Sequence, residues 1–166
     1  MSEQEVEVIK QIFIALKLNP TYHEHEAVIT SEEAAKTRGV PIESGIKALL
    51  LKNGVMEGDD SWVIVDIPAN KKADLKKVAE KLCWSKNKIR MATPQEVEER
   101  TGCIIGAVPP FGHKKRTKIL VDEGVYDNKE SNFNIGLRTI SARIKTTEMK
   151  ILFNYLKAVE GEYAKE

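Results

Sequence analysis

The sequence predicts an α/β (α+β) fold, in which helices flank a mixed central β-sheet. Helical and strand-like segments alternate along most of the chain, whereas the strand signals near the C-terminus follow one another directly. A purely parallel sheet would need a long connection between each pair of strands, so a mixed sheet fits better. A length of 166 residues with 42% hydrophobic residues suits one compact domain spanning residues 1–166.

Several segments have helical character. Apolar residues three and four positions apart predict an amphipathic first helix, which Pro20 ends. Thr30 and Glu33 form a capping box before a second helix, SEEAAKTR, and Gly39 closes it. Further helices are predicted over KADLKKVAEKL, over PQEVEER, and from Thr146 as N-cap to about Val159. The polar tail GEYAKE that follows is predicted to fray.

Strand signals occupy the segments between these helices. Residues 46–51 (IKALLL) are apolar on both faces, which predicts an interior strand covered on both sides. A hairpin-like loop leads from them to a second buried strand, residues 62–67, which ends at Pro68. Shorter strands are predicted at residues 21–25, 88–92, 119–122, 133–135 and 139–144.

Composition and motifs exclude several function classes. A formal net charge of +1 argues against binding nucleic acid through a general excess of cations, so any RNA contact needs a local patch. The chain has neither an apolar leader nor an apolar run long enough to span a membrane, which predicts a soluble, cytoplasmic protein. Cys83 and Cys103 lack metal-ligand spacing and are predicted to be core residues, without a disulfide or a metal site. Because Walker A, GxGxxG, HExxH and GxSxG motifs are absent, no cofactor is expected.

Lys47 is the first residue with unusual surroundings. By two-residue alternation it shares a strand face with Leu49 and Leu51. A lysine on such a face must reach water with its amino group, pair with a carboxylate, or point into a polar cavity. The strand pattern leaves these three interpretations open.

The second feature is the loop TGCIIGAVPPFGHKK, residues 101–115. Gly106 and Gly112 permit close backbone approach, while Pro109 and Pro110 stiffen the loop. Such a loop is either a simple turn or a fixed array of N–H groups that can stabilise an oxyanion. The basic run that follows is either a solvated surface or a patch that contacts phosphates. Its members are His113, Lys114, Lys115, Arg116 and Lys118.

Six segments in this order and spacing resemble the YbaK/prolyl-tRNA synthetase-associated domain family. They are YHEHE, TSEEAA, IKALLLK, DLKKVAEKL, TGCIIGAVPPFGHKK and VDEG, and the resemblance covers roughly residues 20–158. Residues 106–110 match the family's GxxxP loop, and the strand KALL matches its K-x-L-[LV] pattern. The resemblance implies a compact mixed α/β fold that hydrolyses the ester between a mischarged amino acid and the terminal adenosine of tRNA.

The resemblance also implies roles for individual residues. Lys47 is similar to the family's key lysine and is the predicted catalytic residue. The predicted substrate-binding residues are Thr101, Gly102, Gly106, Ala107, Val108, Pro109, Pro110, His113, Asn134 and Gly136. His113 either assists the leaving group or lies on the surface, and His25 has a pocket-edge or structural role. Because no nucleophile triad is evident, the attacking group is expected to be water, a substrate hydroxyl or a substrate thiol.

The implied partner is the acceptor end of mischarged tRNA, with prolyl-tRNA synthetase as a further candidate and with no membrane or DNA partner. Because no synthetase sequence flanks the segment, the resemblance points to a free-standing deacylase. Ala- or Cys-tRNA(Pro) is the expected substrate, selected by pocket volume and a few polar contacts. The alternative is a non-catalytic module that binds tRNA or a synthetase through the basic run.

Overall fold

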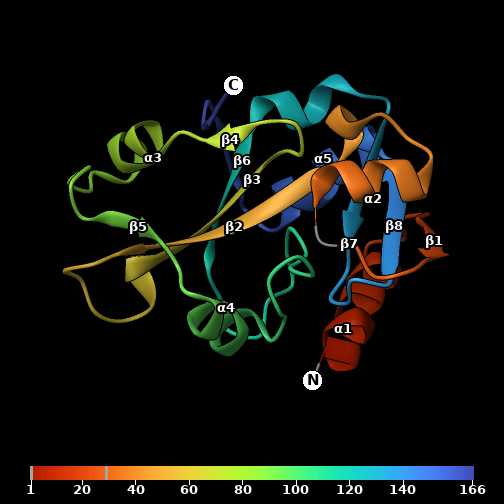
Figure 1. Ribbon diagram of the computed structural model, residues 1–166, viewed down its shortest axis with the longest axis horizontal. Coiled ribbons are helices and arrows are strands. Elements are labelled where there is room, and N and C mark those ends of the chain that lie inside the picture. The colour runs from red at the N-terminus through yellow and green to blue at the C-terminus, as the bar shows by residue number, and fades with distance from the viewer. Residues whose placement is uncertain (1, 29) are drawn as a thin grey trace.

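The computed structural model describes residues 2–28 and 30–166, and its helices surround a five-stranded and a three-stranded β-sheet (Figure 1). The α-helices are α1 (Ser2–Ala15), α2 (Ser31–Arg38), α3 (Leu75–Leu82), α4 (Pro94–Thr101) and α5 (Thr146–Tyr155). Within the described residues, no helix is long and apolar enough to cross a membrane.

The larger sheet has the strand order β5-β2-β3-β6-β9. Its strands are β2 (Ile46–Asn53), β3 (Trp62–Pro68), β5 (Ile89–Met91), β6 (Lys118–Asp122) and β9 (Val159–Gly161). β2 pairs antiparallel with both β3 and β5, whereas β6 runs parallel to β3 and β9. The predictions of a mixed sheet and of an interior strand at residues 46–51 are therefore confirmed.

The C-terminal strand signals form a second, antiparallel sheet with the order β1-β8-β7. Its strands are β1 (Thr21–Glu24), β7 (Glu130–Asn134) and β8 (Ile140–Lys145). A separate short pair joins β4 (Lys72–Ala73) to β10 (Ala164–Lys165). The sheet predicted as one unit is thus divided, and the smaller sheet packs against the core of the larger one.

Different helices pack on the two faces of the larger sheet (Figure 1). Leu50 and Ile64 belong to the core on one face, where Val97 of α4 also lies. Leu51 and the alternate residues of β3 face the other way and pack against α3. Two-residue alternation along β2 therefore assigns neighbouring side chains to two different cores.

An aromatic cluster joins α1 to the loop after α4. The Phe111 ring lies 5.6 Å from the ring of Phe13 on α1 and 5.9 Å from that of Phe133 on β7, both with edge-to-face geometry. All three rings are buried. Because Phe111 directly follows Pro110, this packing anchors the C-terminal end of the GxxxP loop.

The prediction for the C-terminal residues was wrong in two respects. α5 ends at Tyr155 rather than near Val159, and Thr146 is its first residue rather than its cap. The Thr146 hydroxyl instead forms a hydrogen bond with Ser131 Oγ at 3.1 Å. Lys157 then adopts a left-handed conformation (φ 60°), which turns the chain so that residues 159–161 extend the larger sheet.

The tail predicted to fray is instead part of the core. Tyr163 is only 1% exposed. Its backbone N–H and that of Ala164 donate to Asp122 Oδ1, at 2.7 and 3.0 Å. The apolar ring and the paired backbone explain why the polar composition of this segment was misleading.

Candidate active site

A cavity of about 250 Å³ opens between α2, β2, the β5–α4 turn and the loop after α4. Its lining is mostly apolar and comes from residues that are distant in sequence. The polar side chains that line it are Thr30, Ser31, Arg38, Lys47 and Asn134. Among the described residues that line the cavity, none is acidic, and in that part of the chain neither Arg38 nor Lys47 forms an ion pair with a carboxylate.

One wall of the cavity is α2, and its capping signals place it as predicted. The Glu33 N–H donates to Thr30 Oγ1 at 3.1 Å, and Gly39 closes the helix with φ 68°. Ala34 and Ala35 are the buried residues of the helix and line the cavity. Because both side chains are single methyl groups, the helix can approach the sheet and still leave space for a ligand.

Lys47 reaches this cavity from β2. It is half-buried, and in the described part of the chain its amino group has no hydrogen-bond acceptor and no ion-pair partner. Burial is the main cause that lowers the pKa of Lys47, the charge of Glu32 acts in the opposite direction, and Lys72 lowers the pKa further. Of the three open interpretations, a lysine that lines a cavity agrees best with these observations.

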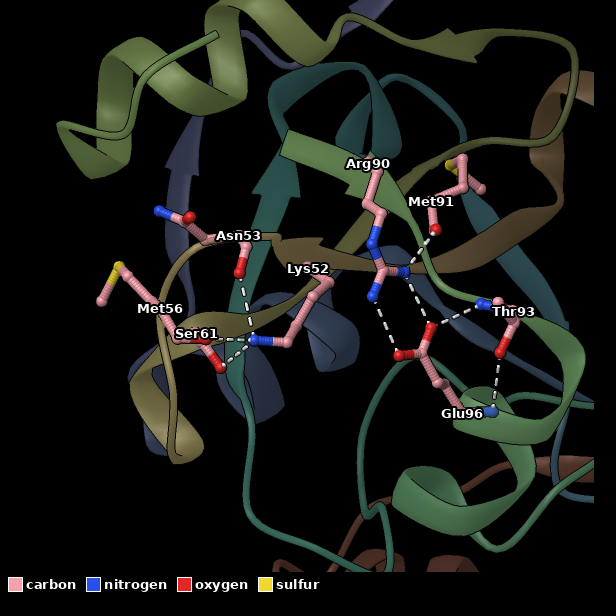
Figure 2. Close-up of polar contacts among 8 residues, drawn as sticks. All are labelled: Lys52, Asn53, Met56, Ser61, Arg90, Met91, Thr93 and Glu96. Atoms are coloured by element: carbon pink, nitrogen blue, oxygen red, sulfur yellow. Dashed lines mark hydrogen bonds and ion pairs between the residues drawn. The ribbon is translucent and has the colours of Figure 1, made fainter. Parts of the chain in front are cut away.

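Lys52, on the same strand, shows the contrasting arrangement (Figure 2). Its amino group donates to the carbonyls of Asn53 and Met56 and to Ser61 Oγ, at 3.0, 2.6 and 2.8 Å. Three acceptors satisfy all the donors of a lysine, so Lys52 stabilises the β2–β3 hairpin. Among the described residues, Lys47 has no comparable set of hydrogen-bond acceptors.

The β5–α4 turn forms another wall and is fixed by an ion pair (Figure 2). Arg90 binds both carboxylate oxygens of Glu96, at 2.8 and 3.0 Å, and Glu96 also completes a capping box with Thr93. The hydrogen bonds from Arg90 are the main reason that the pKa of Glu96 falls to about 2. This turn holds Met91 and Val97 at the cavity.

The predicted GxxxP loop contributes Gly106 and Val108 to the lining. The preceding carbonyl, that of Ile105, accepts hydrogen bonds from Arg138, one of them at 2.9 Å from Nε, and the Gly106 carbonyl accepts one from Asn134 Nδ2. Gly106 has φ 90°, and a Cβ there would lie 3.0 Å from Arg138 Nε. Both requirements favour glycine, and the three hydrogen bonds fix the orientation of the adjoining peptides.

The other predicted loop residues lie behind this surface rather than on it. Ala107, Pro109 and Pro110 are buried and do not line the cavity. His113 Nε2 lies 2.7 Å from the Pro109 carbonyl, and burial lowers the pKa of His113 to about 4. The imidazole is therefore neutral at pH 7 and donates Nε2–H to this carbonyl, which supports the loop from behind.

Three further predicted residues also lie outside the cavity lining. The Thr101 hydroxyl is buried and donates to the Val97 carbonyl at 2.7 Å. Gly102 ends α4 with φ 79°, and Gly136 is a buried glycine with φ 125° after β7. Thr101 and Gly102 thus belong to the end of α4, and Gly136 belongs to the turn after β7.

Sequence reasoning missed Arg38, which lines the cavity from the last position of α2. Its Nε donates to Ser141 Oγ at 2.9 Å, and its Nη2 donates to Asn134 Oδ1 at 3.1 Å. An arginine in the last turn of a helix is ordinary, because it interacts favourably with the helix dipole. No local pattern therefore distinguished it.

Ser141 and His25 form a close pair that resembles a nucleophile and its base. Ser141 Oγ lies 2.7 Å from His25 Nε2, while His25 Nδ1 lies 2.8 Å from the Glu26 carbonyl. Ser141 is only 1% exposed, however, and neither residue lines the cavity. The pair therefore lies outside this cavity, where Ser141 Oγ accepts a hydrogen bond from Arg38 Nε.

The two cysteines have different environments. Cys103 is buried, and this burial raises its pKa to about 12, so the thiol is inert. Cys83 is exposed at the C-cap of α3, with φ 57°. The prediction of a core position is confirmed for Cys103 and wrong for Cys83, because the polar end of α3 leaves its C-cap in solvent.

Comparison with known proteins identifies the family. The model of the aminoacyl-tRNA editing domain matches residues 25–151. The multifunctional Ser/Thr-tRNA deacylase ProXp-y of Escherichia coli (strain K12) is 34% identical over 142 residues, which cover 83% of this chain and 78% of that protein. The proline–tRNA ligase of Thermosipho melanesiensis is 33% identical over 109 residues, which cover 66% of this chain and 18% of the ligase.

A solved structure supports the fold. A candidate trans-editing enzyme for prolyl tRNA synthetase superposes with a TM-score of 0.79 over 98% of both chains, at 23% sequence identity. The family match covers most of the chain, including α2, Lys47, the GxxxP loop and Asn134. The chain therefore belongs to the aminoacyl-tRNA editing domain family.

Proposed function

We propose that the protein is a trans-acting, cytoplasmic aminoacyl-tRNA deacylase, which hydrolyses the ester between a mischarged amino acid and the terminal adenosine of tRNA. The family and the deacylase relative support a hydrolase of aminoacyl-tRNA esters. The observation that carries the proposal is that Lys47 and Gly106 line the same cavity, which has no acidic lining residue among those that the structure describes. The relative that matches over most of its own length supports a protein that acts in trans rather than within a ligase.

The same residues suggest how the ester is broken. Ester hydrolysis needs a positioned attacker and stabilisation of the oxyanion that forms on the carbonyl. Lys47 supplies a cation at the cavity, and the Gly106 N–H has no acceptor among residues 2–28 and 30–166, so both are available to the carbonyl oxygen. In this proposal both groups stabilise the negative charge that develops on the carbonyl oxygen in the transition state.

The attacking group is proposed to be water or a group of the substrate itself. No histidine lines the cavity in the described part of the chain, and Lys47 makes no hydrogen bond to Ser31 or Thr30 there. An activated serine or threonine nucleophile needs such a base within hydrogen-bond reach. A covalent intermediate with the protein is therefore not part of the proposal.

The volume and lining of the cavity favour a small amino acid. The alanine side chains of α2 and the apolar residues of β2 suit Ala or Cys, so Ala- or Cys-tRNA(Pro) is the leading substrate. The Ser31 hydroxyl also lines the cavity and could bind a substrate hydroxyl. This hydroxyl and the Ser/Thr-tRNA deacylase relative make Ser or Thr the second candidate.

The proposal is tested by release of labelled amino acid from tRNA(Pro) charged with Ala, Cys, Ser, Thr or Pro. The wild-type protein is expected to release at least one mischarged amino acid and to leave Pro-tRNA(Pro) intact. Lys47→Ala is expected to lower this rate about 100-fold or more while retaining the fold, because it removes a group that stabilises the oxyanion. Circular dichroism checks the fold.

Lys72→Ala is the matched control, because Lys72 is an exposed lysine near Lys47 that does not line the cavity. It should retain deacylation. Full activity in Lys47→Ala would overturn the role of that lysine. Failure to release any amino acid, with tRNA still bound, would favour the non-catalytic binding module.

A further inference from the structure

The cavity holds more positive charge than the ester carbonyl requires. Arg38 and Lys47 both line it, and within the described residues neither forms an ion pair with a carboxylate. A half-buried cation without a partner is costly, and a second guanidinium, that of Arg143, lies close to Arg38. Such an uncompensated charge at a cavity indicates a site for an anionic ligand.

The hydrogen bonds of Arg38 fix its guanidinium and leave one nitrogen free. Nε is bound to Ser141 Oγ and Nη2 to Asn134 Oδ1, whereas Nη1 has no acceptor in the described part of the protein. These two bonds orient the planar group, so Nη1 has a defined direction before any ligand binds. A purely structural role would explain the two bonds but not the unused donors.

Gly45 keeps the space beside Nη1 open. A Cβ at this position would lie 2.9 Å from Ala69 Cβ and 3.7 Å from Arg38 Nη1. Its φ of −76° is accessible to any residue, so the backbone conformation does not require glycine. The missing side chain instead serves the close packing and the free approach to Nη1 within the cavity lining.

We propose that Arg38 binds the 5′-phosphate of the terminal adenosine through Nη1, which leaves Lys47 and the Gly106 N–H to the ester carbonyl. This assignment rests on the proposed function. Of the groups near the ester, the phosphate is the only anion, whereas the amino acid carries an ammonium group that a cationic cavity disfavours. Guanidinium geometry is well suited to phosphate oxygens.

The assignment is tested with two non-hydrolysable ligands. Both are 3′-aminoacylamido-3′-deoxyadenosines carrying the amino acid that the deacylation panel identifies, one with a free 5′-hydroxyl and one with a 5′-monophosphate. Titration calorimetry of the wild type should show about tenfold or tighter binding of the phosphorylated ligand, the effect of one hydrogen bond to a charged group. In Arg38→Gln this preference should fall below about threefold.

Two variants complete the test. Arg143→Gln removes a neighbouring guanidinium that does not line the cavity. It contacts the Arg38 carbonyl but not the Arg38 guanidinium, so the variant should keep the phosphate preference. Arg38→Lys keeps the charge and should retain part of the preference, which provides a measurement if the glutamine variant does not fold. An unchanged preference in Arg38→Gln, in a protein that still deacylates tRNA, would overturn the assignment alone. Absence of deacylation by the wild type would overturn the proposed function as well.

Discussion

Asp66 is a carboxyl group in the interior of the larger sheet. It lies on β3, opposite Ala48 of β2 and Val121 of β6, and is completely inaccessible to solvent. Within the described residues, neither carboxylate oxygen has a partner. Burial raises the pKa of Asp66 well above its ordinary value, so the folded protein favours the protonated form.

Asp66→Asn is expected to stabilise the protein, and this stabilisation should be larger at high pH than at low pH. The unfolded chain loses the Asp66 proton near pH 4, whereas the folded protein retains it to a higher pH. The wild type therefore loses stability as the pH rises from about 4 through the folded pKa, and asparagine does not titrate. Urea unfolding at pH 4, 6 and 8 should show that the variant has a higher free energy of unfolding than the wild type, by an amount that grows to about 1–3 kcal/mol at pH 8. A gain independent of pH would contradict protonation in the folded state.

At the scale of elements, the C-terminal strands complete both the larger sheet and one of its cores. β9 pairs with the outer edge of β6, and Tyr163 fills the core on the α3 face. In the described part of the protein, the Tyr163 hydroxyl is buried without a hydrogen-bond partner. The ring thus contributes apolar contacts while its hydroxyl contributes a cost.

Two substitutions at Tyr163 should therefore have opposite effects. Tyr163→Phe removes only the unpaired hydroxyl and is expected to raise the free energy of unfolding by up to about 1 kcal/mol. Tyr163→Ala removes the ring and should lower it by about 3 kcal/mol or more. Urea unfolding at constant pH measures both variants. Equal destabilisation by the two would show that the hydroxyl has a partner in solution.

Local signals determined how well each element could be predicted from the sequence. α2 begins and ends where Thr30 and Gly39 predict, because capping depends on neighbouring residues. The end of α5 was misjudged because Leu152, Leu156 and Val159 continue a helical spacing. The competing interaction is the pairing of residues 159–161 with β6, a contact that no local pattern reveals.

The residues of the candidate site also differ in how well the sequence could predict them. Lys47, Gly106, Val108 and Asn134 match family motifs, and all four line the cavity. Arg38 was not predicted because the residues that orient it, Asn134 and Ser141, lie about 100 residues further along the chain. Only the folded structure brings its guanidinium to the cavity. The apolar walls, by contrast, follow from the strand and helix patterns.

At the scale of the whole molecule, charge is unevenly placed in a protein of formal net charge +1. The basic run of residues 113–118 has exposed side chains at Lys114, Lys115 and Arg116. The N–H groups of Lys114 and Lys115 donate to the last carbonyls of α4, at 3.2 and 2.9 Å. Because α4 also carries Val97 of the cavity wall, the run is fixed relative to the candidate site.

A double variant, Lys114→Ala with Arg116→Ala, should weaken tRNA binding and its dependence on salt. Each lost phosphate contact reduces the slope of log affinity against log salt by about 0.7–0.9, so two contacts reduce it by about 1.4–1.8. Filter binding between 50 and 200 mM salt measures the slope. Lys76→Ala with Lys81→Ala removes the same charge from exposed positions of α3 and should leave it unchanged. Equal slopes for both double variants would place the tRNA elsewhere.

The late position of β9 in the chain has a consequence for synthesis on the ribosome. β6 is complete at Asp122, but the strand that covers its outer edge begins only at Val159. At ordinary rates of translation this interval lasts a few seconds, during which β6 presents unpaired backbone groups to other nascent chains. Slow codons between these two strands would lengthen that exposure, so we expect them to reduce the soluble yield more than slow codons placed before β6.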